Sequence, residues 1–390
     1  MNLATIQEAL QGSGLDGWLF FDHHRRDPAA YRLLGIPDEV GASRRWYYLI
    51  PAQGEPARLV HQIESKALDS LPGVKSTYSS WPDQQSKLAS ILKGLRRVAM
   101  QYSPNCAIPL VSMVDAGTVE LVRSTGVEIV TSADLLQQFE ATWTDSQLQS
   151  HLRAGELVDQ VRKEAFELIG EKLRADVSVT EYDIQQFIRG RFQHFNLFTD
   201  HGPIVAVNSH ASDPHYEPSR EASAQIQRND LVLIDMWAKL QTPKSVYYDI
   251  TWTGFCGEII PDRIQNVFEV VTKARKAASD FVLGQIAAGV PIRGFEVDDV
   301  ARTYIKDRGL GEYFFHRTGH SIGTEVHGTG ANMDNWECHD DRRLIPGTCF
   351  SVEPGVYLPE FGIRSEVNVY IGQGSARVTG QEQHEMVRVT

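Results

Sequence analysis

The most constraining stretch of this chain carries three histidines, His316, His320 and His327, on a background of glycine and β-branched residues that continues to Gly328. His316 and His320 are spaced i, i+4, which could present a zinc pair on one helix face. The glycines and β-branched residues oppose a helix there and favour turns and strands. Because neutral imidazole is the most common metal ligand and titrates nearest neutral pH, the cluster indicates either metal binding or proton transfer.

Four acidic residues in the C-terminal part of the chain lie in or at the ends of strand-like segments. Asp235 and Glu353 each follow a short apolar run, Asp249 lies in an alternating segment, and Glu366 shares one face of another segment with Arg364. An ionised carboxylate at the end of a buried strand costs free energy unless a cation or hydrogen bonds compensate it. Adjacent carboxylates also repel, which raises one pKa unless they hold a metal together. The pattern therefore predicts a shared cation site.

The predicted ligand set is dominated by oxygen, with one or two imidazole nitrogens. Such a set suits Mn²⁺, Mg²⁺ or Co²⁺ better than a thiolate zinc site, and carboxylate bridges favour two metal ions. Two divalent ions would nearly balance four carboxylates and a hydroxide, which gives the formal net charge of −12 a local explanation. The same charge argues against nucleic acid or an anionic membrane as a partner, because both need clustered Lys and Arg.

At 390 residues the chain exceeds the usual size of a single core, so two domains are expected. The first part alternates strand-like and helix-like segments and predicts a modest α/β domain. Its strands are expected at 17–21, 46–50 and 97–102, and a helix at 84–95. We find no signal peptide or membrane-spanning run in the sequence, so the cytoplasm is the expected compartment.

A capping box from Thr144 to Gln147 opens a long amphipathic helix, and we place the domain boundary before it, giving domains 1–143 and 144–390. Another helix is expected after Thr180, a third at 261–286 with Pro261 in its first turn, and a fourth at 297–307. Strands rich in Val, Ile, Tyr and Thr lie between and after them. The second domain is thus predicted to be mixed α+β.

The acids and one histidine follow the order Asp, Asp, His, Glu, Glu, in five contexts: Leu-Ile-Asp235, Tyr-Asp249-Ile-Thr, Thr-Gly-His320-Ser-Ile-Gly, Ser-Val-Glu353-Pro-Gly and Gly-Ile-Arg364-Ser-Glu366. This order resembles the pita-bread metallopeptidases, which comprise methionine aminopeptidase, aminopeptidase P and prolidase, with creatinase as a metal-free relative. The resemblance is specific from about residue 145 onward, and the first part resembles the creatinase-like N-terminal domain of prolidase and aminopeptidase P loosely. It implies an α+β pita-bread catalytic domain with a smaller creatinase-like α/β domain before it.

The resemblance also implies a role for each matching ligand. Asp249 and Glu366 would bridge two metal ions. Asp235 would complete the site of one ion, and His320 and Glu353 would complete the site of the other. Glu353 would in addition take a proton from the attacking water and pass it to the leaving amine.

Four further residues match groups on the substrate side. His327, on a strand predicted to run on from His320, would steady the tetrahedral intermediate, and His215 would lie near the scissile bond. His316 and Arg364 match substrate-binding groups of the proline-specific branch. Arg364 could instead pair with Glu366, and the sequence leaves both roles open.

The chain departs from the family pattern at several positions that are not ligands. Trp237 stands where a glycine is usual, Trp252 where an arginine is usual, and Gly328 where an acid is usual. The step of 14 positions from Asp235 to Asp249 is also longer than the usual one. We expect these departures to reshape the substrate pocket.

The leading hypothesis is an Xaa-Pro dipeptidase (prolidase) or aminopeptidase P that cleaves Xaa-Pro dipeptides or N-terminal Xaa-Pro peptides through a metal-bridging hydroxide. Its two ions would be Mn²⁺, with Co²⁺, Zn²⁺ or Mg²⁺ as alternatives, and the resemblance implies a homodimer. A second hypothesis is an enzyme of the same fold acting on a small non-peptide molecule, such as an amidine hydrolase or a lyase, with the unusual tryptophans lining a different pocket. A third is a non-catalytic binding module, which the costly buried charges of the ligand set oppose.

Overall fold

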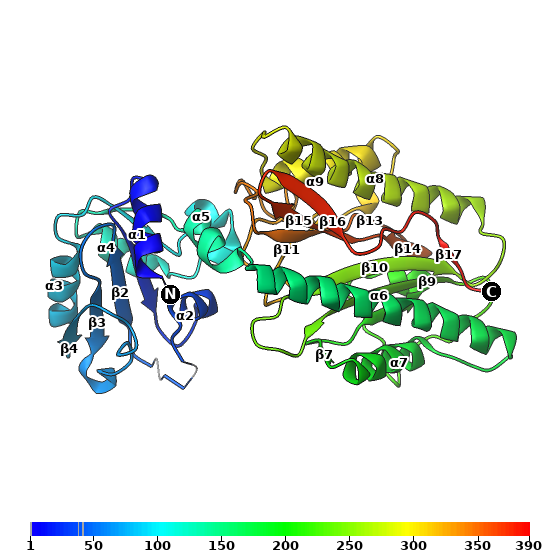
Figure 1. Ribbon diagram of the computed structural model, residues 1–390, viewed down its shortest axis with the longest axis horizontal. Helices are drawn as coiled ribbons and strands as arrows, with labels where there is room; N and C mark the ends of the chain where they lie inside the picture. Colours follow the sequence, from blue (N-terminus) through cyan, green and yellow to red (C-terminus); the bar gives the residue numbers. More distant parts are fainter. Residues whose placement is uncertain (1, 38, 41–42) are drawn as a thin grey trace. The chain divides into compact units, whose positions relative to one another are not determined.

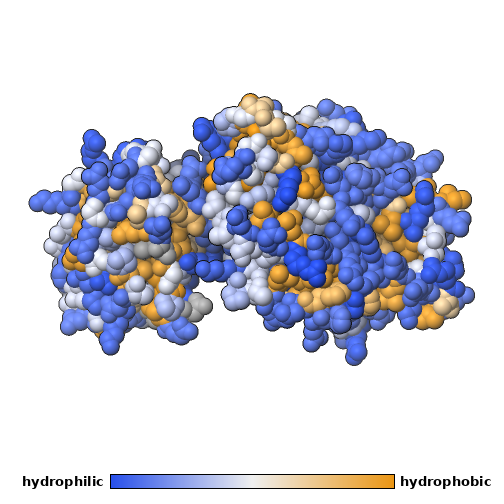
Figure 2. Space-filling model, viewed as in Figure 1, coloured by the Kyte–Doolittle hydropathy of each residue, from blue (hydrophilic) through white to orange (hydrophobic). Residues whose placement is uncertain are grey.

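The computed structural model describes residues 2–37, 39–40 and 43–390 and contains two compact units, Met1–Glu140 and Ala141–Thr390 (Figure 1). Each unit packs hydrophobic cores of its own. No helix within the described ranges is both long enough and apolar enough to cross a membrane. On the face drawn in Figure 2, hydrophilic side chains predominate, with apolar patches scattered among them.

The N-terminal unit is built on a six-stranded sheet in the order β4-β3-β2-β1-β5-β6. The sheet is mixed, because β1 pairs antiparallel with β2 and parallel with β5. The strands predicted near residues 17, 46 and 97 are observed as β1, β2 and β5. The elements of this unit are α1 (Leu3–Gly12), β1 (Gly17–Asp22), α2 (Pro28–Leu34), β2 (Trp46–Pro51), β3 (Ala57–His61), β4 (Val74–Tyr78), α3 (Trp81–Leu92), β5 (Arg97–Met100), α4 (Ala116–Arg123), β6 (Glu128–Thr131) and α5 (Ala133–Leu136).

Helix α3 begins and ends three residues earlier than the sequence predicts. Pro82 lies in its first turn, where a missing N–H costs nothing. Lys93 has extended backbone, and Gly94 follows with a φ of 87°. The helix therefore stops before Leu95, which was predicted to belong to its apolar face.

The C-terminal unit contains two larger sheets and a β-hairpin. One sheet has the order β17-β10-β9-β7, with β8 also paired to β9, and the other has the order β11-β12-β15-β16. In Figure 1, α6 and α7 lie along one side of the strands, and α8 and α9 lie along the other. The elements are α6 (Asp145–Arg174), α7 (Glu181–His194), β7 (Leu197–Phe198), β8 (Ile204–Val207), β9 (Leu231–Leu240), β10 (Tyr248–Phe255), α8 (Asp262–Ala287), α9 (Gly294–Lys306), β11 (Ser321–Ile322), β12 (Cys349–Val352), β13 (Gly355–Leu358), β14 (Phe361–Arg364), β15 (Val367–Gly372), β16 (Ser375–Thr379) and β17 (Val387–Arg388).

The long helix α6 starts as its sequence predicts. The Thr144 hydroxyl accepts the backbone N–H of Gln147 at 3.3 Å, and the Gln147 side chain accepts the Thr144 N–H at 3.0 Å, so the predicted capping box is confirmed. Thr180 and Asp183 cap α7 in the same reciprocal way. Pro261 was predicted in the first turn of α8 but immediately precedes the helix.

Helix α9 begins at Gly294, earlier than the predicted Val297. A Cβ at Gly294 would lie 2.0 Å from the carbonyl oxygen of Asn332, so only glycine allows this approach. The Gly294 N–H donates to the Arg342 carbonyl at 3.1 Å. The first turn of α9 is thus joined to the loop that follows the histidine stretch.

The strand predicted through His327 is wrong. β11 covers only Ser321–Ile322, and the Gly328 N–H donates back to the Ser321 carbonyl at 2.6 Å, which closes the segment into a loop. A Cβ at Gly328 would lie 2.9 Å from the Ser321 hydroxyl oxygen. Any side chain at this position would therefore crowd the Ser321 side chain in this conformation.

Candidate metal centre

Two neighbouring strands bring Asp235 and Asp249 to one face of a sheet. Asp235 lies in β9 and Asp249 in β10, and the antiparallel register places Thr251 opposite Asp235 and Trp237 opposite Asp249. Directly opposite residues share a face, as do residues two apart on a strand, so both acids project from the same side. The unusually long sequence separation between Asp235 and Asp249 is accommodated by the turn at residues 241–247, and the two strands pair in a regular antiparallel register.

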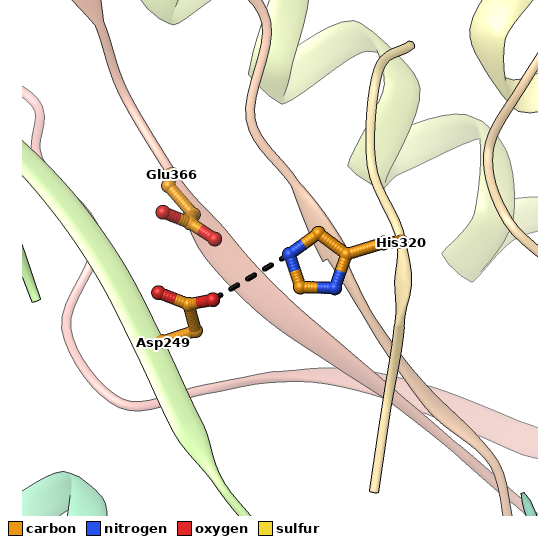
Figure 3. Close-up of side chains that lie close together, drawn as sticks. All are labelled: Asp249, His320 and Glu366. Carbon is orange, nitrogen blue, oxygen red and sulfur yellow. Dashed lines mark ion pairs between the residues drawn. The ribbon is translucent and has the colours of Figure 1, made fainter. Parts of the chain in front are cut away.

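Segments at the ends of strands in the second sheet bring in the other predicted ligands. His320 precedes β11, Glu353 follows β12, and Glu366 lies between β14 and β15. Asp249, His320 and Glu366 are buried, and each offers one ligand atom within 4.8 Å of the others. In Figure 3 the two carboxylates lie beside each other and face the imidazole ring. Glu353 lies on the same side of the ring, because its Oε1 is 3.3 Å from Nε2 of His320.

Hydrogen bonds orient the His320 ring. Its Nδ1 lies 3.2 Å from the Ser321 carbonyl, which can only accept, so Nδ1 carries the proton and Nε2 keeps a lone pair in the neutral ring. Nε2 lies 3.5 Å from Oδ2 of Asp249. The backbone N–H of His320 donates to the Ser351 hydroxyl oxygen at 2.9 Å, and that hydroxyl donates to the Glu353 carboxylate at 3.0 Å. A second group that fixes the ring in this way is typical of metal-binding histidines.

The Arg364 guanidinium is buried among the acids. Its Nη2 pairs with Asp235 at short range, Nη1 donates to the Tyr357 hydroxyl at 3.1 Å, and Nε donates to the Thr251 hydroxyl at 3.0 Å. Nε also lies 3.8 Å from Glu353. The ion-pair partner suggested by the sequence was Glu366, but the structure assigns Asp235 and Glu353 to that role.

Burial raises the pKa of two of these acids, because too little positive charge lies nearby to stabilise their ionised forms. It raises the pKa of Asp235 to about 7, with the Arg364 guanidinium opposing and the Asp249 carboxylate adding to the shift. Burial, and then the Asp249 carboxylate, raise the pKa of Glu366 well above its usual range. Oε2 of Glu366 accepts the Thr251 hydroxyl at 2.9 Å, but Oε1 is buried with no hydrogen-bond donor in the described part of the chain. A divalent cation would supply both the missing partner and the missing charge, so the donor set fits a metal.

A cavity of about 820 Å³ opens onto this centre. All of the residues that the sequence predicts for the metal and substrate sites line it: Asp235, Asp249, His320, Glu353, Glu366, His215, His316, His327 and Arg364. The volume is in the usual range for small-molecule sites. The structure therefore brings the predicted residues together around one space.

The three remaining histidines differ in their surroundings. His316 is held on both sides, with Nδ1 at 2.7 Å from the Arg317 carbonyl and Nε2 at 2.7 Å from the Tyr357 hydroxyl, and burial lowers its pKa to about 4. The His327 ring lies edge-on to His320, with ring centroids 4.3 Å apart, and the charge on His320 lowers the pKa of His327 to about 3. His215 is exposed, and its backbone N–H donates to a side-chain carboxylate two residues before it.

The unusual tryptophans have separate roles. Trp237 lines the cavity, whereas Trp252 is 9% exposed and packs in the core under the Arg162 guanidinium, 3.5 Å from the ring centroid. The expectation that Trp252 reshapes the pocket is wrong, because its ring packs against α6 instead.

Sequence reasoning missed three residues of the site. Thr251 follows Asp249 on the alternating segment and shares its face, so a signal was present. Tyr357 joins His316 to Arg364 through its hydroxyl, which only the pairing of β13 with β14 brings into place. Asp200, which lines the cavity, is an isolated acid in a loop and has no such signal.

Comparison with known proteins agrees with this geometry. Residues 149–373 match the model of Metallopeptidase family M24. The chain is 35% identical over 237 residues to an Xaa-Pro dipeptidase from Lactobacillus delbrueckii subsp. lactis, a match that covers 60% of this chain and 58% of that protein's length. A probable dipeptidase PepE from Mycobacterium tuberculosis (strain ATCC 25618 / H37Rv) is 27% identical over 345 residues, covering 87% of this chain and 84% of that protein.

The fold also has close likenesses among solved structures. The crystal structure of dipeptidase PepE from Mycobacterium ulcerans covers 99% of this chain and 96% of its own, with a TM-score of 0.72 at 24% identity. This likeness confirms the predicted α+β pita-bread fold. Because the matched segment spans more than half of the sequence and contains every predicted ligand, the chain belongs to metallopeptidase family M24.

Proposed function

We propose that this enzyme is a dinuclear metal-dependent hydrolase that cleaves the amide bond of Xaa-Pro dipeptides or of N-terminal Xaa-Pro peptides. The observation that carries the proposal is the buried cluster of Asp249, His320 and Glu366, with ligand atoms within 4.8 Å of one another at the cavity. Family membership and the dipeptidase names of similar proteins support the substrate class.

In this proposal Asp249 and Glu366 would be shared by two divalent ions. Asp235 would help to hold one ion, and His320 and Glu353 would help to hold the other. Mn²⁺ is favoured because oxygen donors outnumber nitrogen donors and thiolates are absent from the set, with Co²⁺, Zn²⁺ or Mg²⁺ as alternatives. When bound, the ions would polarise the scissile carbonyl and make water a stronger acid.

Glu353 is proposed to move the proton. Burial alone would raise its pKa, but the neighbouring imidazoles of His320 and His316 and the Arg364 guanidinium together outweigh burial and hold the pKa of Glu353 below its usual value. The carboxylate is therefore ionised, as a general base must be. The Ser351 hydroxyl fixes Oε1 at 3.0 Å. In this role the Glu353 carboxylate takes a proton from the attacking water and delivers it to the leaving amine nitrogen.

The other cavity residues would act on the substrate. His327, with a pKa of about 3, is neutral at pH 7 and would donate an N–H to the oxyanion that develops on the scissile carbonyl. His215 is proposed to face the scissile bond and His316 to contact the bound peptide, since both line the cavity. The donors of Arg364 are taken up by Asp235 and two hydroxyl groups, which supports a role in holding the ligand acid.

The test is hydrolysis of Gly-Pro and of a longer Xaa-Pro-Xaa peptide by the purified protein, with and without added Mn²⁺. We expect metal-dependent release of proline from Gly-Pro. Asp249→Asn should lose both activity and metal by elemental analysis, whereas Asp280→Asn, on the exposed side of α8, should lose neither. Hydrolysis of neither peptide by a metal-loaded protein would favour the small non-peptide substrate instead. Light scattering on the same sample would test the proposed homodimer.

A further inference from the structure

Trp237 lies directly beside the candidate metal centre. It follows Asp235 by two residues on β9 and stands opposite Asp249 in the antiparallel ladder. Side-chain alternation therefore places its indole on the same sheet face as both acids. The residue lines the cavity, so a large aromatic ring takes up room next to the proposed reaction site.

The indole is held on more than one side. Its Nε1–H donates to Oδ1 of Asp200 at 2.8 Å. The ring is partly buried and packs against two apolar clusters, one that contains Ile204 and one that contains Tyr247 and Val326. A tryptophan fixed both through its N–H and through its apolar faces has little freedom to swing away. We regard it as a rigid wall of the cavity.

The edge of this wall is negatively charged. Burial raises the pKa of Asp200, but the hydrogen bond from Trp237 and the neighbouring His201, whose Nδ1 lies 3.2 Å from Oδ2 of Asp200, together outweigh burial. The pKa therefore lies below its usual value, and the side chain is ionised at neutral pH. Asp200 also lines the cavity. In a dipeptide the first residue carries the ammonium group and the second carries the carboxylate. An anionic edge therefore suits the first residue of the substrate.

The geometry points to Trp237 as the residue that limits the size of the substrate's first side chain, and to Asp200 as the positioning residue that holds the indole in place. This inference rests on the proposed Xaa-Pro hydrolysis and adds which Xaa the enzyme accepts. Small first residues, such as glycine or alanine, are preferred over bulky ones, such as leucine or phenylalanine.

The test compares kcat/KM for Gly-Pro and Phe-Pro in the Mn²⁺-loaded enzyme. Trp237→Ala should raise the kcat/KM ratio of Phe-Pro to Gly-Pro by at least about tenfold, because one methylene more or less in an apolar pocket already changes kcat/KM by roughly 10–200-fold. Trp81→Ala removes an indole that is 68% exposed in the N-terminal unit and serves as the matched control. An unchanged ratio in Trp237→Ala would overturn the role of the wall.

The part played by Asp200 is tested with two variants. Asp200→Asn keeps an oxygen that accepts the indole N–H and should retain the wild-type ratio. Asp200→Ala releases the indole and should shift the ratio toward that of Trp237→Ala. Equal effects of the two variants, including no effect of either, would overturn the positioning role.

Calorimetric binding of the same two dipeptides separates this inference from the proposed reaction. If the wild-type enzyme binds Gly-Pro more tightly than Phe-Pro but hydrolyses neither, the size-limiting role of Trp237 is supported and the proposed reaction is overturned. If it hydrolyses both with equal kcat/KM, the proposed reaction is supported and the size-limiting role of Trp237 is overturned. If it neither binds nor hydrolyses either dipeptide, both are overturned.

Discussion

At the residue scale, one carboxylate of the candidate metal centre differs from its neighbours. The pKa of Glu353 lies below its usual value, whereas burial raises that of Asp235 to about 7. The cause is local. Glu353 has the imidazoles of His320 and His316 beside it as well as the Arg364 guanidinium, while Asp235 has the Arg364 guanidinium close by together with two other acids. Similar side chains at one site are thus prepared for different tasks.

Glu353→Gln should lower kcat on Gly-Pro by at least about a hundredfold, because general acid–base catalysis contributes roughly 10²–10⁴-fold. The amide has nearly the same size and keeps one oxygen that can act as a ligand, so dipeptide binding should remain measurable by calorimetry. Glu360→Gln is the matched control, since Glu360 forms an exposed pair with Arg263. A kcat close to wild type in Glu353→Gln would exclude the proton-transfer role.

Which residues of the site could be predicted from the sequence depends on how far apart the partners lie. Asp235 and Glu353 each end an apolar segment, which is a local signal that any single sequence contains. The partner of Arg364 was not predictable in this way. Local alternation favoured Glu366, two positions away, but the guanidinium reaches Asp235, 129 positions away, because sheet packing decides which acid it meets.

At the element scale, helix α9 holds the histidine segment through one buried acid. Asp298 is fully buried and accepts the backbone N–H of Thr318 at 2.9 Å and its hydroxyl at 2.7 Å. The same carboxylate pairs with Arg302, one turn later, at 2.8 Å. Since Thr318 is two residues before His320, the position of this helix is coupled to the position of a proposed metal ligand.

Asp298→Asn should destabilise the protein by about 3–5 kcal/mol, the usual cost of breaking one side of a buried ion pair. It should also weaken metal binding, because His320 loses part of its support. Urea unfolding and a metal titration measure the two effects. Asp299→Asn changes the next, exposed residue of the same helix and should leave both nearly unchanged. Wild-type metal affinity in Asp298→Asn would show that α9 does not position His320.

Helix and strand boundaries were predictable where local chemistry decides them. The hydrogen bonds that start α6 and α7 join residues three positions apart, and both starts were predicted. The start of α9 at Gly294 and the short β11 were missed, because each depends on an approach to a loop, at Asn332 in one case and at Gly328 in the other. Such approaches leave a glycine in the sequence but do not name its partner.

At the scale of the whole molecule, metal should stabilise only one of the two units. All proposed ligands lie within Ala141–Thr390. A ligand that binds the folded form adds RT ln(1 + [L]/Kd), about 2.7 kcal/mol at a hundredfold excess over Kd. In scanning calorimetry, Mn²⁺ should therefore raise the transition of this unit and leave that of Met1–Glu140 in place.

Glu366→Gln provides the control for this experiment, because it removes a proposed bridging carboxylate and should abolish the Mn²⁺-dependent shift. Equal shifts of both transitions would show that the ions act on the whole chain and not on the C-terminal unit alone. Mass spectrometry of protease-resistant fragments assigns each transition to its unit.

The general organisation of the chain could be predicted from its length and from its pattern of strand-like and helix-like segments, but the arrangement of its sheets could not. Alternating segments predicted an α/β first part, and the structure contains a six-stranded mixed sheet there. The order β4-β3-β2-β1-β5-β6 depends on pairings between distant strands, such as β1 with β5, which no local pattern encodes. The family match also covers only residues 149–373, so it adds nothing to the first unit.

The proposed ligands come from two separate sheets and the segments that flank them, with Asp235 and Asp249 on one side and the remaining three on the other. Divalent ions bound between them would hold the two sheets of the C-terminal unit together, and removal of the ions would weaken this link. Without the ions, the sheets are joined at this point by the Glu366 N–H to Thr251 carbonyl bond of 3.1 Å and its neighbours, against the mutual repulsion of the acids. Loss of the ions is therefore expected to make the two sheets of this unit easier to separate.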